Sequence, residues 1–281
     1  MREISVEQIK SHVVPLCLTA AYDLPQDVRD AIEGAIGGEP SPLGRSMLEQ
    51  LLENCQIACK DRVPICQDTG VAVFFVEMGQ DAHITGGSLN EALADATEKA
   101  WKDAYLRMSI VADPLFGRKN THTNTPPIVH LRLVPGDGLK ITIAPKGGGS
   151  ENMSRLAMLK PTAGVAAVAD FVCETVVSAG GNPCPPVIVG VGVGGNFEMA
   201  PLLAKRALLR TVGKPSPDAN YAELEKKLLE RINASGVGPQ GLGGRTTALA
   251  VHIEHHPCHI ASLPVAVNIN CHAARHASVE I

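Results

Sequence analysis

Aromatic residues are scarce in this chain of 281 residues, which contains one Trp, three Tyr and five Phe. The charge balance is slightly acidic, with a formal net charge of −4. Proteins that bind nucleic acids combine a basic surface with aromatic side chains on which bases stack. The sequence therefore argues against nucleic acid as a partner. It also lacks an apolar run close to the roughly 20 residues that span a bilayer, which argues against a membrane protein.

The N-terminal segment lacks the basic start of an export signal. Glu3 and Glu7 stand where such a signal carries positive charge. Ile4, Ile9 and Val13 recur at helical spacing, which predicts an ordinary amphipathic helix. We expect a cytoplasmic protein that is long enough to bury a large core without disulfides.

What the chain does contain is a mixture of helical and β patterns. Amphipathic or apolar runs predict helices at 5–21, 26–36, 46–60, 87–106, 162–178, 197–209 and 218–233. Short β-branched runs predict strands at 71–76, 128–134, 139–144, 186–191, 246–254 and 263–269. These segments mix without strict alternation and no linker separates them. We therefore predict one α+β (mixed α/β) domain over residues 1–281, with helices around mixed β-sheets.

Two glycine-containing stretches carry turn or loop signals. Pro-Gly-Asp-Gly at 135–138 stands between two predicted strands and predicts a β-hairpin. Gly190, Gly192 and Gly195 match the G-x-G-x-x-G spacing of dinucleotide-binding proteins. However, the expected second strand with its acidic residue is replaced by a proline-containing loop at 211–218. Close packing of a helix on a strand is the favoured interpretation, and a nucleotide-binding module is the weaker alternative.

The chain has eight cysteines but no Cys-x-x-Cys pair. Four of them lie in predicted helices, where they are expected to be buried hydrophobic residues: Cys17, Cys55, Cys59 and Cys173. Three others stand in loops at the edges of predicted strands: Cys66, Cys184 and Cys271. Three thiolates from three loops can hold a metal or cluster that keeps one position open for a substrate. The pattern leaves the role of Cys258 undecided.

Histidines cluster near the C-terminus, and the stretch HIEHHPCH resembles a zinc site superficially. Strand alternation is expected to send His252 and Glu254 to one face and Ile253 and His255 to the other. A polar strand end with one or two site histidines is favoured over a zinc centre. A non-catalytic zinc or redox-sensing protein is the alternative from another functional class.

The stretch PKGGGSEN at 145–152 joins a predicted strand to a predicted helix. Three consecutive glycines leave backbone N–H groups that can form a nest for an anion, and Lys146 adds positive charge. The alternative interpretation is a flexible turn.

Six blocks of sequence resemble the class I, iron–sulfur-dependent fumarate hydratase family, in its α subunit or the N-terminal half of its single-chain members. The resemblance covers about residues 10 to 280, and the L-tartrate dehydratase α subunit shares the cysteine loops. The blocks are PICQDTG (64–70), KNTHTNTPP (119–127), APKGGGSENM (144–153), the stretch 182–210, GPQGLGGRTT (238–247) and NINCHAARHA (268–277).

The resemblance implies a [4Fe–4S] cluster held by Cys66, Cys184 and Cys271, with one iron open to substrate. It also implies two groups of site residues. The residues expected to bind substrate are Gln67, Arg107, Lys146, Gly148 and Gly149. The residues expected to be catalytic are Asp68 and His259. For Asp68 a second interpretation is open, in which its carboxylate caps the CQDTG turn.

The implied reaction is the reversible hydration of fumarate to L-malate, a step of the tricarboxylic acid cycle. The alternatives within the superfamily are an L-tartrate dehydratase α subunit and a mesaconate hydratase. The resemblance further implies a separate β subunit that supplies the base and further cations, in an α2β2 heteromer. The chain alone is then expected to bind a cluster and to turn over a small dicarboxylate poorly.

Overall fold

A computed structural model describes all 281 residues, and their contacts divide the chain into two compact units. Unit 1 contains Met1–Pro25, Cys55–Gly148 and Arg275–Ile281, and unit 2 contains Gln26–Asn54 and Gly149–Ala274. Because the chain passes back and forth between the units, no linker in the sequence marks either of them. The α+β class is confirmed. A single domain over residues 1–281 stays a prediction.

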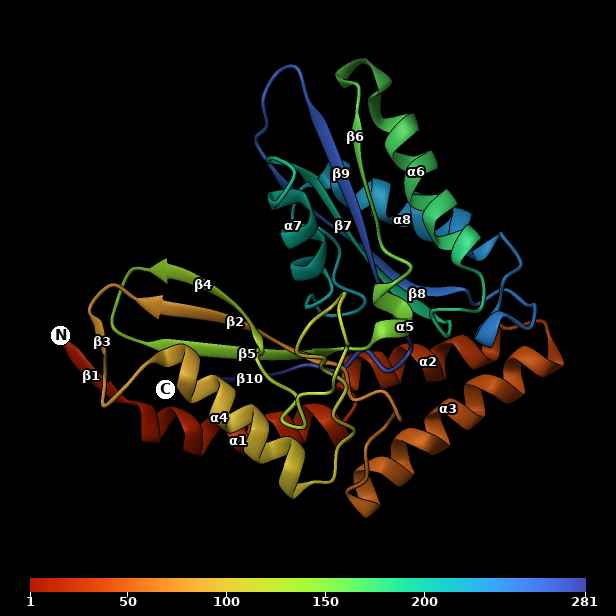
Figure 1. Ribbon diagram of the computed structural model, residues 1–281. Helices are drawn as coiled ribbons and strands as arrows, with labels where there is room; N and C mark the ends of the chain where they lie inside the picture. The colour runs from red at the N-terminus through yellow and green to blue at the C-terminus, as the bar shows by residue number, and fades with distance from the viewer. The chain divides into compact units, whose positions relative to one another are not determined.

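Unit 1 packs two long helices on one face of a mixed four-stranded sheet, beside a two-stranded parallel pair (Figure 1). The order in the larger sheet is β10-β5-β2-β4, and β1 pairs with β3. Its helices are α1 (Val6–Tyr22) and α4 (Leu89–Asp103). Its strands are β1 (Arg2–Ser5), β2 (Val71–Gly79), β3 (Ala82–Thr85), β4 (Ile128–Val134), β5 (Leu139–Lys146) and β10 (Ala277–Glu280).

The core of unit 1 lies between these helices and the sheet. Ile9 and Val13 on α1, Trp101 on α4 and Phe74 on β2 are fully buried in one cluster. The helix predicted at 5–21 forms as α1 with Ser5 as its N-cap, since the Ser5 hydroxyl accepts the N–H of Gln8 at 3.1 Å. The apolar stripe read from the sequence is thus the face that packs on the sheet.

The predicted hairpin is wrong, although both of its strands form. Strand β2 lies between β4 and β5, parallel to the first and antiparallel to the second. The turn at 135–138 wraps around the end of β2, where the N–H groups of Gly79 and Asp81 donate to the carbonyls of Gly138 and Gly136 at 2.8 and 2.9 Å. The residues at 135–138 predicted a turn correctly. They could not predict that β2, which is distant in the sequence, would lie between the two strands that this turn joins.

Unit 2 holds a second mixed sheet, in the order β6-β9-β7-β8. Its strands are β6 (Arg155–Leu159), β7 (Val187–Gly194), β8 (Ala248–His256) and β9 (Leu263–Asn270). Its α-helices are α2 (Gln26–Gly38), α5 (Gly148–Glu151), α6 (Gly164–Ala179), α7 (Met199–Ala207) and α8 (Ala219–Asn233). Two single-turn 3₁₀ helices lie at Pro161–Ala163 and Pro239–Gly241. Helix α3 (Pro42–Asp61) begins in unit 2 and ends in unit 1, and the first residue of α5, Gly148, belongs to unit 1.

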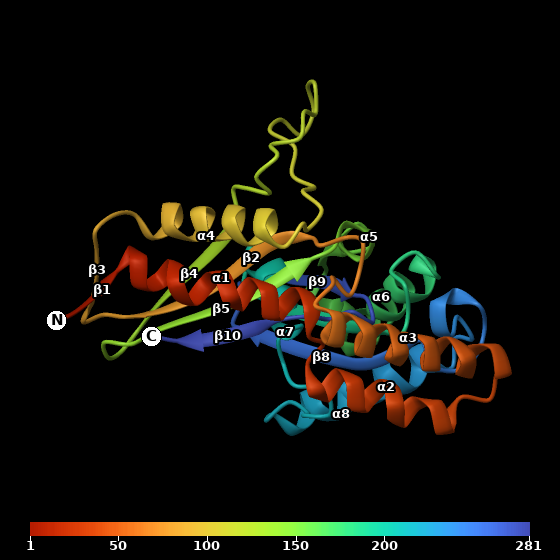
Figure 2. The same cartoon turned by 90° about the horizontal axis from the view of Figure 1, so that it is seen from below.

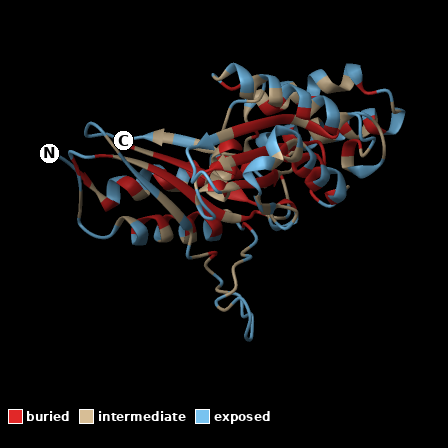
Figure 3. Ribbon diagram, turned by 90° about the horizontal axis from the view of Figure 1, so that it is seen from above, coloured by how far each residue is buried: buried red, intermediate tan, exposed pale blue.

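Helices cover both faces of the unit 2 sheet. Val189 and Val191 of β7 pack with residues of α6 and α8, and Ala200 and Ala204 of α7 pack with Ala266 of β9 on the other face. Figure 3 shows these strands buried, while the outer sides of the helices are exposed. The continuous apolar run of β7 follows from burial on both faces.

The glycines of β7 serve close packing, as the favoured interpretation of their spacing predicted. A Cβ added at Gly190 would meet the Ala204 carbonyl oxygen at 2.1 Å, and one at Gly192 would meet the Ala200 carbonyl oxygen at 2.0 Å. Only glycine lets the backbone of α7 approach the strand this closely.

The segment Pro161–Ala179, which includes α6, is long and apolar enough to span a membrane by length and composition alone. In the structure, its Val172 and Val176 belong to the core of unit 2. Its Asp170 carboxylate pairs with Arg231 at 2.7 Å. The expectation that the chain lacks an apolar run close to 20 residues is therefore wrong, although one face of this segment packs in the core of unit 2.

Other differences from the predicted elements are small. Helix α3 begins at Pro42 rather than residue 46, because proline suits the first helical position. Helix α4 is shorter than the predicted 87–106, and its N-cap Ser88 makes no side-chain capping bond. The short strands β1, β3, β6 and β10 lacked a pattern strong enough to predict.

Candidate active site

The loop that carries Cys66 joins α3 to β2 in unit 1. Its backbone is held where the N–H of Ile65 donates to the carbonyl of Ala21 at 3.1 Å. Cys66 itself is half-buried and Gln67 is exposed. The loop thus presents both predicted side chains near its surface, immediately before the buried strand.

Asp68 connects this loop to the glycine stretch. One carboxylate oxygen accepts the N–H of Gly70 at 3.0 Å and the other accepts the N–H of Gly148 at 2.7 Å. The backbone carbonyl of Asp68 accepts from Nη2 of Arg275. Gly70 has φ of +79°, and a Cβ there would lie 2.8 Å from the backbone of Lys146, so the turn requires glycine. The Asp68 carboxylate therefore caps the CQDTG turn, as the second interpretation of this residue predicted.

Thr69 fixes the backbone of Arg107. The buried Thr69 hydroxyl donates to the Arg107 carbonyl at 2.6 Å and accepts from the indole N–H of Trp101 at 3.1 Å. The side chain of Arg107 is exposed. The Arg107 backbone is thus tethered to the CQDTG turn, while its exposed guanidinium is available to a ligand carboxylate.

Asn124 anchors the long loop between α4 and β4. Its fully buried side chain donates to the Gly70 carbonyl at 3.1 Å and accepts the N–H of Ser109 at 2.8 Å. Figure 2 shows the loop projecting beyond α4. The loop that carries Arg107 is therefore rooted on the same turn as Asp68.

One of the backbone N–H groups of the glycine stretch is already bound by a side chain of the same chain. The N–H of Gly148 is taken by Asp68, while Gly148 and Gly149 both remain exposed. Lys146 is only 5% exposed, and its ammonium group donates to the Gly147 carbonyl at 3.4 Å. The structure thus brings Asp68, Lys146 and Gly148 together within unit 1.

Unit 2 brings the loops of the other two predicted cysteines together. The N–H of His272 donates to the Cys184 carbonyl at 3.4 Å, and its ring Nδ1 lies 3.0 Å from the same oxygen. The same Nδ1 also lies 3.3 Å from Nε2 of Gln240, so which of the two contacts is a hydrogen bond depends on the tautomer of the ring. His272 directly follows Cys271, so the two cysteine loops are joined. Cys184 is exposed and has φ of +54°, an uncommon backbone conformation that is found at functional sites.

Gln240 supports the Cys184 loop from the GPQGLGG block. Its backbone N–H and its side-chain Nε2 both donate to the Pro185 carbonyl, at 2.8 and 2.7 Å. Sequence reasoning did not select Gln240, although it lies within one of the blocks that carry the resemblance.

A polar network joins three of the other blocks in unit 2. Lys205 of α7 pairs with the Glu151 carboxylate at 2.6 Å. Asn268 of β9 donates to Glu151 at 2.7 Å and to the Ser154 hydroxyl at 2.8 Å. The network fixes the end of the glycine stretch against the strand that leads to Cys271.

Another carboxylate fills a backbone nest in unit 2. Glu39 is 1% exposed and accepts the N–H groups of Ser41, Arg245 and Thr246 at 2.7–3.0 Å. Burial alone would raise the pKa of Glu39, but these hydrogen bonds outweigh it and lower the pKa. The GLGGRTT loop, which has Arg where a phosphate-binding loop has Lys, thus binds a carboxylate of its own chain.

The remaining cysteines divide as predicted with one exception. Cys17, Cys55 and Cys173 are buried, and burial raises the pKa of Cys17 to about 12, as expected for an inert core thiol. The prediction for Cys59 is wrong, because it lies on the exposed face of α3. Cys258 is exposed and its thiol donates to the Ser262 carbonyl.

The histidines near the C-terminus follow the predicted alternation. Ile253 packs into the core of unit 2, and the ring of His255 stacks on Tyr221 of α8 with centroids 4.2 Å apart. His252 contacts the last residue of α7 on the other face. His259 lies in an exposed turn, where its Nδ1 accepts the N–H of Ala261 at 3.1 Å. Its catalytic role stays a prediction.

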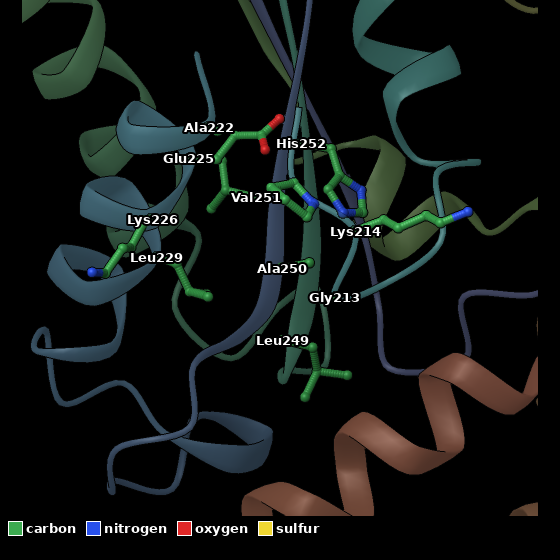
Figure 4. Close-up of a pocket in the computed structure, with 11 residues that line it drawn as sticks. Gly213, Lys214, Ala222, Glu225, Lys226, Leu229, Leu249, Ala250, Val251 and His252 are labelled. Atoms are coloured by element: carbon green, nitrogen blue, oxygen red, sulfur yellow. The ribbon is translucent and has the colours of Figure 1, made fainter. Parts of the chain in front are cut away.

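A pocket of about 320 Å³ lies between α8, β8 and the 213–215 loop, and none of the predicted site residues lines it (Figure 4). The buried His252 ring borders it, and burial lowers the pKa of His252. The ammonium groups of Lys214 and Lys226 point away from each other. The pocket therefore has no focus of positive charge that would bind a dicarboxylate.

Neither unit by itself gathers three or more His, Cys, Asp or Glu side chains into a metal-binding group. Unit 1 contributes Cys66, and unit 2 contributes Cys184 and Cys271. In unit 1 the loop of Cys66 continues into the turn that Asp68 holds, and in unit 2 the two cysteine loops are joined through His272.

Known proteins resemble this chain over almost its whole length. The family model described as fumarate hydratase (Fumerase) matches residues 10–280. A protein of Methanocaldococcus jannaschii, provisionally named L(+)-tartrate dehydratase subunit alpha, is 43% identical over 276 residues, which cover 96% of each chain. The L(+)-tartrate dehydratase subunit alpha of Escherichia coli K12 is 36% identical over 278 residues, covering 98% of this chain and 91% of its own. The protein of that name from Shigella sonnei shows the same identity and coverage.

Proposed function

The chain belongs to the fumarate hydratase family and is a hydro-lyase, and from this we propose that it is the α subunit of a [4Fe–4S]-dependent enzyme. Its substrate would be a small dicarboxylate that gains or loses water next to a carboxylate group. The observation that carries the proposal is the junction of the Cys184 and Cys271 loops through His272, within a family match that spans residues 10–280.

The donor set fits an iron–sulfur cluster. Iron–sulfur clusters take thiolate ligands, and the proposed ligands Cys66, Cys184 and Cys271 are the half-buried or exposed cysteines of the site loops. The buried thiols of the core helices are unsuited to this role. When bound through three thiolates, the cluster would supply an open iron that acts as a Lewis acid on the leaving hydroxyl group.

The residues of unit 1 would bind and orient the substrate. Arg107 would take one carboxylate in a two-pronged hydrogen bond. Gln67 would offer an amide to a second polar group, because its side chain is exposed beside Cys66. Such donors also stabilise the charge that develops on a carboxylate when a proton is removed from the carbon next to it.

Asp68 would act first as a positioning residue. Its carboxylate holds the N–H groups of Gly70 and Gly148, so the turn and the glycine stretch keep one arrangement. Its predicted role in moving a proton, and that of His259, remain part of the proposal. In that part, the separate β subunit would supply the catalytic base.

The relatives change the order of the candidate substrates. The sequence resemblance placed fumarate and L-malate first, whereas the compared α subunits are named for L(+)-tartrate dehydratases. We therefore propose L(+)-tartrate as the first substrate to assay, with fumarate and L-malate second, as the family model's description favours. Mesaconate is a third candidate. All three reactions add or remove water across a bond next to a carboxylate.

The names of the relatives as alpha subunits support a β subunit as partner. The proposal includes an α2β2 assembly in the cytoplasm, where thiols stay reduced.

The proposal is tested by anaerobic co-expression of the chain with candidate β-type subunits. The purified complex is assayed with L(+)-tartrate, L-malate, fumarate and mesaconate, against the chain alone as control. We expect turnover of one substrate by the complex and little by the chain alone. Full activity of the chain alone would contradict the need for a partner. A colourless protein with tightly bound zinc after anaerobic reconstitution would favour the metal- or redox-sensing alternative.

A further inference from the structure

We propose that Arg275 is a positioning residue whose buried positive charge is matched by the iron–sulfur cluster. The inference rests on the proposed function, because it concerns how this chain receives that cluster. Arg275 lies in the NINCHAARHA block, four residues after Cys271, and neither sequence spacing nor the resemblance selected it.

The surroundings of Arg275 are unusual for a charged side chain. It is 3% exposed, and Nη2 donates to the Asp68 carbonyl. Its Nε and Nη1 are buried with no hydrogen-bond partner, and no carboxylate forms an ion pair with it. A guanidinium keeps its charge in proteins, so the folded chain holds a buried cation without a counter-charge.

Two buried carboxylates of the chain are satisfied, whereas Arg29 shares with Arg275 a buried Nε that has no hydrogen-bond partner. Glu225 is 5% exposed and pairs with Arg210 at 2.6 Å, and it also accepts the N–H groups of Ser216 and Ile253. Glu39 is held by backbone N–H groups from both ends of unit 2's sequence. Since buried charges are normally paired, the two unpartnered nitrogens of Arg275 indicate that this cation is stabilised by negative charge close by.

The position of Arg275 identifies the source of that negative charge. The Asp68 carbonyl that it holds belongs to the residue two places after Cys66, on the proposed ligand loop of unit 1. A cluster held by three thiolates carries net negative charge, because the thiolates outweigh the charge of an oxidised core. In a low-dielectric interior a nearby cation stabilises that charge without direct contact. Because Nε and Nη1 of Arg275 are buried away from solvent, the proposal has them act on the cluster through their charge and not by contact with a substrate carboxylate.

Arg275 also helps to fix residues that are predicted to bind the substrate. By holding the Asp68 peptide it fixes the carboxylate that binds Gly148. The same side chain thus links the charge balance of the cluster with the arrangement of the glycine stretch.

The test compares Arg275→Met with the wild type, both without cluster and after anaerobic reconstitution. Without cluster, removal of the unpaired charge should leave the urea midpoint unchanged or higher. With cluster, the variant should be less stable than the loaded wild type. Its reduction should be about tenfold less favourable, which is about 59 mV in a one-electron titration followed by electron paramagnetic resonance. Arg275→Lys, which keeps the charge, should restore most of the potential.

Arg231→Met is the matched control, because it also removes one positive charge, from an exposed pair with Asp170. Arg231→Met should change neither the reduction potential of the cluster nor the difference in urea midpoint between the protein with and without cluster. Equal destabilisation of both forms by Arg275→Met, with an unchanged potential, would overturn the proposal, since Arg275 would then only support the fold. Failure of both Arg275→Met and Arg275→Lys to fold would overturn it for the same reason. A wild type that takes up no cluster would instead refute the proposed function before any variant is compared.

Discussion

Single polar residues hold together segments that are far apart in the sequence. The Asp68 carboxylate joins the turn before β2 to Gly148, eighty residues later. The Thr69 hydroxyl joins the same turn to Arg107. Because each of these bonds fixes a predicted substrate-binding group, they lead to tests at the level of individual side chains.

Thr69→Val should raise KM more than it lowers kcat. Valine has nearly the shape of threonine but leaves the Arg107 carbonyl and the Trp101 indole N–H without their partner. The loss of stability should be about 1–3 kcal/mol, the usual effect of leaving a buried polar group unsatisfied. Steady-state kinetics of the assembled enzyme measure the first effect and urea unfolding the second. Thr85→Val, on strand β3 outside this cluster, serves as control. Unchanged KM in Thr69→Val would show that the bond does not place Arg107.

Glu39→Gln should destabilise the chain by about 2 kcal/mol at pH 7, because an amide cannot accept all the N–H groups that the carboxylate binds. Urea unfolding checks this, with exposed Glu33→Gln on α2 as control. A loss no larger than the control's would mean that the nest tolerates a neutral group.

The same carboxylate should give the wild type a distinct acid dependence. The pKa of Glu39 is lowered in the folded chain, below its ordinary value of 4.5. Its contribution to stability is therefore fully present above the unfolded-state pKa and is lost as pH falls through the folded-state pKa. Between pH 5 and acid unfolding, the free energy of unfolding should fall more steeply in wild type than in Glu39→Gln. Parallel curves would contradict the assignment.

For single residues, the sequence predicted which side chains are buried better than it predicted which residues they contact. Cys17 and Cys173 were identified as core residues from their apolar neighbours, and the structure confirms both. The role of Arg275 could not be predicted, because its partner Asp68 lies 207 residues away. Cys59 was misplaced because its helix, α3, carries a narrower buried face than the spacing of its cysteines suggested.

At the scale of elements, strong patterns predicted strands but not their neighbours. The Val- and Ile-rich run of β7 was identified because it is buried on both faces. The Pro-Gly-Asp-Gly turn indicated a hairpin, yet β2 occupies the place between β4 and β5. Pairing with a distant strand buried Phe74 and Ile141 in one core, which a local hairpin would not have done.

Substitution of the β7 glycines should separate packing from ligand binding. Gly190→Ala and Gly192→Ala place a Cβ about 2 Å from the backbone of α7, so the helix must move. We expect a loss of about 1–3 kcal/mol or more in urea unfolding. Gly34→Ala on α2 meets nothing within 4 Å and should instead add about 0.5–1 kcal/mol. Neutral behaviour of both β7 variants would reopen the nucleotide-binding interpretation.

At the scale of the whole molecule, the two units share one chain that passes between them repeatedly. This interleaving explains why the sequence, read from end to end, shows no linker. It also distributes the proposed cluster ligands, one in unit 1 and two in unit 2. Their identity came from the resemblance, since loop position alone did not distinguish them from Cys258.

The cysteine ligands provide the most direct test of the central claim. Cys66→Ser, Cys184→Ser and Cys271→Ser are compared with the exposed Cys59→Ser and Cys258→Ser after anaerobic reconstitution, by iron and sulfide analysis and electron paramagnetic resonance. We predict about four iron and four sulfide per chain in wild type and both controls, as expected for one [4Fe–4S] cluster, and loss of the cluster in each of the three site variants. Full retention in any of those three, or loss in the controls, would contradict the account.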